Sequence, residues 1–116
     1  MRAIKELQEH AKQLAQVLPE ITAEQRTLFL LTEVGEVARE VLRLSGSASQ
    51  ANTDAIKADL GMEMYDVIWN ICDLANMLSI DLEASFAAKI EGAPPSLTIA
   101  STLRATRSAA NAGKRS

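Results

Sequence analysis

A segment of twenty-five residues, 54–78, constrains the fold of this chain more than any other feature. Its apolar residues recur every three to four positions, which is the period of an α-helix and not the alternation of a strand. At about 100° per residue, five of its polar side chains fall on one narrow stripe and apolar residues fill most of the remaining circumference. Such a helix is predicted to be buried on most sides, with the stripe lining a cavity or binding a cation; the alternative is the water-facing edge of a bundle. The stripe consists of Asp59, Glu63, Asp66, Asn70 and Asp73.

The same periodicity predicts three further helices, and no segment has the pattern of a strand. Pro19 is predicted to end the first helix. Thr22 and Gln25 match a capping box that opens the second, and Asp81 has the character of an N-cap for the fourth. The fold class is therefore predicted to be all-α, a four-helix-bundle-type domain. The predicted helices span about residues 2–18, 22–44, 53–78 and 81–90, with a polar connector over residues 45–53.

Charge divides the chain into an acidic body and a basic tail. Residues 1–91 carry eight Lys or Arg and fifteen Asp or Glu, a net of −7, whereas residues 92–116 carry four basic residues and no acidic one. We therefore expect one helical domain over 1–91 and an Ala- and Ser-rich tail over 92–116 that is weakly helical around 102–111 or disordered. The acidic body argues against nucleic acid as a partner, and the tail either contacts anionic partners or is simply solvated.

The chain has no apolar segment typical of a secretory signal or of a membrane-spanning helix. Its single cysteine, Cys72, excludes an intrachain disulfide and fits a reducing compartment. We therefore expect a cytoplasmic protein without a membrane partner. Cys72 lies in an apolar helical run and is predicted to be a small buried hydrophobe. The single histidine, His10, has no Ser or Cys partner nearby in sequence and is predicted to be a surface or packing residue.

Four acidic residues form two pairs with i, i+3 spacing, Glu33 with Glu36 and Glu63 with Asp66. That spacing puts both carboxylates of a pair on one helix face. Like charges gathered there repel, so a site that holds all four needs a cation, and oxygen ligands suit Mg²⁺ or Mn²⁺. Gly35 is costly inside a helix and is predicted to mark a close backbone approach, which would bring the two pairs together.

A simpler interpretation of the second helix is also open. Arg26, Arg39 and Arg43 lie at the margins of its acidic face. Glu36 and Glu40 would then form ordinary ion pairs with Arg39 or Arg43. This alternative needs no cation.

Two segments of the chain, LTEVGEVA at 31–38 and EMYDVI at 63–68, resemble the two halves of the signature of the MazG-like nucleotide pyrophosphohydrolases. That signature reads E-E-x-x-E, a spacer, then E-x-x-D, and the spacer here is 26 residues long. The segment 74–84 also resembles the family's continuation, so the resemblance covers about residues 28–89. The chain departs from the pattern at Thr32, where the family has its first Glu, and at 92–95, where the family often has Asn and an Arg-Tyr pair.

The resemblance implies an all-α homodimer or homotetramer that hydrolyses a nucleoside triphosphate to the monophosphate and pyrophosphate. It also implies that Mg²⁺, or Mn²⁺ in its place, is held by four residues that act as the catalytic carboxylates: Glu33, Glu36, Glu63 and Asp66. Lys89 stands where many members have a lysine and, with Lys57, is a candidate for phosphate contact. The candidates for contact with the base or sugar are Phe29, Tyr65, Trp69 and Asn70. Core packing is the alternative for the three aromatic residues, and an ordinary surface position is the alternative for Lys57.

Two other functions are compatible with the sequence. The first is a catalytically degenerate helical module that binds metal or nucleotide, or that serves only in assembly, and Thr32 favours it. The second is a carboxylate-bridged di-iron bundle. Such sites usually carry Glu-x-x-His pairs, which this chain lacks.

Overall fold

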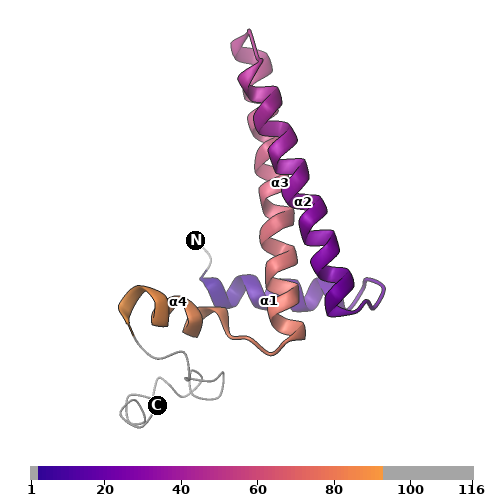
Figure 1. The fold of residues 1–116 in the computed structure, drawn as a ribbon, viewed down its shortest axis with the longest axis vertical. Coiled ribbons are helices and arrows are strands. Elements are labelled where there is room, and N and C mark those ends of the chain that lie inside the picture. Colours follow the sequence, from indigo (N-terminus) through magenta and orange to yellow (C-terminus); the bar gives the residue numbers. More distant parts are fainter. Residues whose placement is uncertain (1–2, 93–116) are drawn as a thin grey trace.

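The computed structural model describes residues 3–92, which form four α-helices packed together, with no strand in that range (Figure 1). The helices are α1 (Ile4–Ala15), α2 (Ala23–Ser45), α3 (Gln50–Met77) and α4 (Leu82–Glu91). α2 and α3 lie side by side as a long antiparallel hairpin, α1 crosses the lower end of this hairpin, and α4 lies beside α1 (Figure 1). The predicted all-α fold is confirmed. Of the predicted tail, only Gly92 belongs to the described residues, and the helix predicted around 102–111 lies wholly outside them.

The predicted helix caps of α2 and α4 are confirmed. Thr22 Oγ1 accepts a hydrogen bond from the Gln25 N–H at 3.1 Å, and Gln25 Oε1 accepts one from the Thr22 N–H at 2.9 Å. The Asp81 carboxylate accepts a hydrogen bond from the Ala84 N–H at 3.2 Å. α4 ends at Glu91 and is followed by its C-cap, Gly92, whose φ of 78° is the left-handed conformation that favours glycine. These caps satisfy backbone groups that the helix ends leave without a partner.

Two helix boundaries differ from the prediction. α1 ends at Ala15, because the next three residues form i to i+3 hydrogen bonds, which tighten the chain into turns before Pro19. α3 begins at Gln50, because the Ser49 side chain accepts a hydrogen bond from the Asn52 N–H at 3.1 Å and caps the helix. The connector between α2 and α3 is therefore shorter than predicted.

The core lies where α1 crosses α3. Ala11, Trp69 and Cys72 are buried there, and Leu7, Leu14 and Leu82 pack around them. Burial raises the pKa of the Cys72 thiol. The prediction that Cys72 is a buried hydrophobe is confirmed.

Gln8 fixes α1 against the end of α3 and the start of α4. Its Nε2 donates to Asn76 Oδ1 and to the Ile80 carbonyl at 2.9 Å each, and its Oε1 accepts from the Leu82 N–H at 2.8 Å. Asn76 Nδ2 in turn donates to the Gln8 carbonyl at 2.9 Å. These bonds set the position of α1, whose C-terminal end lines the candidate site described below.

The prediction that α3 is buried on most sides is wrong for the single chain. Met62, Met64, Ile68 and Ile71 are all exposed. The reason is that α2 covers one side of α3, α1 covers only the lower end of another, and the hairpin extends well beyond α1 (Figure 1). Within residues 3–92, none of the helices combines the length and the hydropathy that a membrane crossing requires.

Candidate functional site

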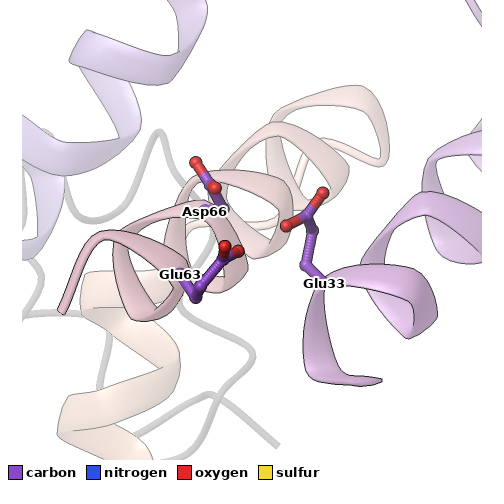
Figure 2. A group of neighbouring side chains, drawn as sticks. All are labelled: Glu33, Glu63 and Asp66. Atoms are coloured by element: carbon purple, nitrogen blue, oxygen red, sulfur yellow. The ribbon is translucent and has the colours of Figure 1, made fainter. Parts of the chain in front are cut away.

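Three carboxylates from two helices meet on the hairpin, where they point toward one another (Figure 2). Glu33 comes from α2, and Glu63 and Asp66 come from successive turns of α3. One oxygen of each lies within 4.8 Å of an oxygen of each of the other two. We call these residues the acidic triad. Antiparallel packing of α2 and α3 thus brings together three of the four carboxylates that the sequence singles out.

Glu36, the fourth carboxylate, lies outside the acidic triad. It pairs with Arg39 on its own helix. Glu40 pairs in the same way with Arg43, whose Nη1 also lies 3.9 Å from Asp59 Oδ2. The simpler interpretation of α2, in which these glutamates form ion pairs along the helix, therefore describes Glu36 and Glu40 but not Glu33.

Gly35 and Thr32 bring no further group to the acidic triad. A Cβ at Gly35 would meet no atom within 4 Å, so the prediction of a close backbone approach there is wrong for the described chain. Thr32 Oγ1 donates a hydrogen bond to the Leu28 carbonyl at 3.2 Å and so stays on its own helix. The triad is thus a set of three carboxylates.

The surroundings of Glu33 raise its pKa. Partial burial is the largest cause, followed by the negative charges of Asp66 and Glu63 and by a side-chain hydrogen bond with Glu63. Full ionisation of the acidic triad is therefore unfavourable in the absence of a cation. An oxygen-only donor set of this kind fits Mg²⁺ or Mn²⁺.

In metal-free protein near pH 8, we expect Glu33→Gln to raise Tm by roughly 2–4 °C, because it removes like-charge repulsion. The folded state holds the Glu33 proton to higher pH than the unfolded chain does. Stability is therefore lost as pH rises from the ordinary glutamate pKa through the raised folded value. Thermal unfolding in EDTA from pH 4 to pH 8 measures the effect, with the exposed Glu9→Gln as control. If Glu33→Gln raised Tm by the same amount at pH 4, like-charge repulsion would not be the origin of the gain.

A pocket of about 280 Å³ opens beside the acidic triad, between α1, α2 and α3. Its apolar lining consists of Leu14, Leu18, Phe29, Tyr65 and Trp69. Its polar lining consists of Arg26, Glu33, Asp66 and Asn70, so two members of the triad form part of its wall. Aromatic walls with a few convergent polar groups are typical of ligand sites, and this volume lies just below their usual range of roughly 300–1,000 Å³.

Arg26 is buried and organises the polar side of this pocket. Its Nε donates to Asp73 Oδ2 and its Nη1 to Asn70 Oδ1, each at 2.8 Å. Its guanidinium lies 4.4 Å from the centre of the Trp69 ring and 5.7 Å from that of Phe29. Arg26 therefore holds the Asn70 amide and the Trp69 indole in place.

Sequence reasoning missed this role of Arg26. It placed the residue only at the margin of the acidic face. Arg26 precedes Glu33 by seven residues, or two helical turns, so the spacing already put it on the face that packs against α3. No sequence pattern indicates that its partner is Asp73, which is 47 positions away.

The remaining candidates divide into those at the pocket and those away from it. Phe29, Trp69 and Asn70 line it, and Asn70 Nδ2 donates to the Asp66 carbonyl at 2.7 Å. Lys57 and Lys89 are exposed and do not line it.

Tyr65, in the pocket wall, shares a 2.7 Å hydrogen bond with His10 Nε2 of α1. The two rings meet edge to face, with their centres 5.9 Å apart. His10 therefore has a packing role, and it orients the Tyr65 ring that faces the pocket.

The α2–α3 hairpin thus gathers three carboxylates, an aromatic pocket and a buried arginine in one place. Comparison of the chain with protein-family models, with curated proteins and with solved structures finds no match. The functional conclusion therefore rests on the chemistry of these side chains and on the sequence resemblance described above.

Proposed function

We propose that this protein is a Mg²⁺-dependent nucleoside triphosphate pyrophosphohydrolase, which converts a (d)NTP and water into the (d)NMP and pyrophosphate. One observation carries the proposal: the acidic triad shares two residues with the lining of an aromatic pocket. Clusters of exposed carboxylates are common without a metal ion. The adjoining pocket is what favours a ligand that carries both an aromatic base and phosphates.

Electrostatics make a divalent cation necessary for this activity. Residues 1–91 carry a net charge of −7 and therefore repel a polyphosphate. Glu33, Glu63 and Asp66 would hold Mg²⁺, which keeps several waters when few protein carboxylates bind it. When bound, the ion neutralises the phosphates and lowers the pKa of a coordinated water. A carboxylate of the triad that is not fully engaged with the ion would serve as the base that accepts a proton from water.

The pocket accounts for the nucleoside part of the substrate. Phe29 and Tyr65 are exposed in the pocket wall and offer ring faces on which a base stacks. Asn70 offers its remaining amide proton and lone pair to the base or sugar, because one of each already engages Asp66 and Arg26. The phosphates would then extend toward the acidic triad.

Two lysines, a fourth carboxylate, and the assembly and location of the protein complete the proposal. Lys57 precedes Glu63 on α3 by about 9 Å along the helix axis and lies about 120° away around it, so its role as a phosphate contact rests on the sequence analysis alone. The resemblance alone supports Lys89 as a phosphate contact. It alone also supports Glu36 as a fourth metal ligand, and Glu36 would have to leave its ion pair with Arg39 to bind the ion. We propose a cytoplasmic homodimer or homotetramer that acts on nucleotides and does not bind nucleic acid or membrane.

The decisive experiment is pyrophosphate release from a panel of canonical and modified (d)NTPs with Mg²⁺ or Mn²⁺. We expect release from at least one nucleotide, with the monophosphate as second product and complete loss of activity in EDTA. Release that persists in EDTA, or none from any nucleotide by folded protein, would overturn the proposal.

A catalytically degenerate binding module is the second candidate, and two observations favour it. Thr32, at the position of the family's first Glu, bonds back to the Leu28 carbonyl, and Glu36 is engaged with Arg39. Calorimetry distinguishes the candidates: the module would bind a nucleotide only with Mn²⁺ or Mg²⁺ present and release no pyrophosphate.

A further inference from the structure

Tyr65 is one of two aromatic side chains of the pocket that keep much of their ring surface free. It is 45% exposed and Phe29 is 51% exposed. Trp69, in contrast, is only 8% exposed, and the Arg26 guanidinium lies 4.4 Å from the centre of its ring. Tyr65 also immediately precedes Asp66, which belongs both to the acidic triad and to the pocket wall. A base that stacks on Tyr65 would therefore lie beside the carboxylates that bind the phosphates through the cation.

The orientation of the Tyr65 ring is fixed from outside the pocket. Exposed side chains ordinarily change rotamer freely, and a ligand that stacks on such a ring must first order it. Here His10 Nε2 lies 2.7 Å from Tyr65 Oη, and the two rings meet edge to face. Neutral imidazole has one donor and one acceptor nitrogen, so a phenol can hydrogen-bond to either tautomer. The ring is therefore held in place before any ligand binds.

His10 is itself held by the position of α1. It lies four residues before Leu14, on the face of α1 that contributes Leu14 to the pocket lining. The hydrogen bonds of Gln8 to the end of α3 and the start of α4 fix this helix two residues before His10. His10 belongs neither to the pocket lining nor to the acidic triad. Any effect that it has on a ligand in the pocket therefore passes through Tyr65.

Packing alone does not require the hydrogen bond of His10. α1 already contacts α3 through a buried core of Ala11, Trp69 and Cys72. The bonds of Gln8 fix the same helix independently. The His10 side chain is only half-buried, and a single exposed hydrogen bond contributes little to the stability of a fold. The effect of this bond on the pocket can therefore be separated from its effect on folding.

We propose that His10 is a positioning residue for nucleotide binding, whose hydrogen bond holds the Tyr65 ring as a preformed stacking surface for the base. The inference rests on the proposed function, because the nucleotide substrate is the ligand that stacks there. It assigns the effect of His10 to substrate binding and not to the chemical step, since the bond exists before the nucleotide arrives.

The test is His10→Phe in the full chain, which keeps a ring beside Tyr65 but removes the hydrogen bond. The probes are the (d)NTP that releases pyrophosphate fastest and its α,β-methylene analogue, each with Mg²⁺. We expect KM, and the Kd of the analogue by calorimetry, to rise roughly 3–10-fold, because the nucleotide must now order the ring. We expect kcat to stay within about twofold of wild type. His10→Gln, whose amide can replace the ring nitrogen, should restore most of the affinity, and the exposed Glu9→Gln is the control.

Tyr65→Phe removes the same hydrogen bond from the other side and keeps the test open if His10→Phe does not fold. It should raise Kd as much as His10→Phe does, and the double variant should show no further rise. An active wild type whose KM and Kd are unchanged by these variants, or a loss confined to kcat, would overturn the inference and leave the proposed function standing. A folded wild type that neither hydrolyses nor binds any nucleotide would overturn the proposed function and the inference together.

Discussion

Asp66→Asn is expected to reduce metal-dependent pyrophosphate release by about 1,000-fold or more, which corresponds to several kcal/mol of lost cation-assisted stabilisation. Asp66 belongs both to the acidic triad and to the wall of the pocket. Asparagine keeps the size of the side chain but removes its charge and one oxygen ligand. We expect the loss in kcat/KM under saturating Mg²⁺ and a parallel loss of Mn²⁺ binding, measured by electron paramagnetic resonance.

The matched control for this variant is Asp54→Asn, at an exposed position of the same helix. Asp54 Oδ1 accepts a hydrogen bond from Gln50 and lies outside the acidic triad. We expect this control to keep wild-type activity and metal binding. Near-wild-type activity in Asp66→Asn would place the chemistry away from the triad.

Arg26→Ala is expected to lower the free energy of unfolding by about 3–5 kcal/mol. The substitution leaves the Asp73 carboxylate buried without its cation and removes the donor to Asn70. Such a loss is a large fraction of the total stability of a small domain. Urea unfolding followed by circular dichroism measures it. Trp69 is the only tryptophan, so its fluorescence reports whether loss of the stacked guanidinium alters the pocket wall.

Two further variants separate the ion pair from a general effect of removing an arginine. Arg39→Ala removes the exposed partner of Glu36 and should cost no more than about 1 kcal/mol. The double variant Arg26→Met, Asp73→Leu should recover most of the stability, because it leaves no buried charge without a partner. If Arg26→Ala cost as little as Arg39→Ala, the buried pair would not stabilise the fold.

Features of this protein that depend on neighbours within a few residues could be predicted from the amino-acid sequence. The capping box of Thr22 and Gln25 and the Asp81 cap were predictable because each involves residues three positions apart. The shared face of Glu63 and Asp66 follows in the same way from the helical period. Even the start of α3 is a local feature, since Ser49 caps it, although the polar connector offered several competing caps.

Which of these local features meet in space depends on how the helices pack. The choice of Glu33 over Glu36 for the acidic triad depends on the rotation of α2 against α3, which spacing along one helix does not fix. The pairing of Arg26 with Asp73 depends on the register of the same two helices. The exposure of α3 depends on how far α1 extends along the hairpin, because the apolar pattern of a helix shows which side chains favour burial but not whether another element covers them.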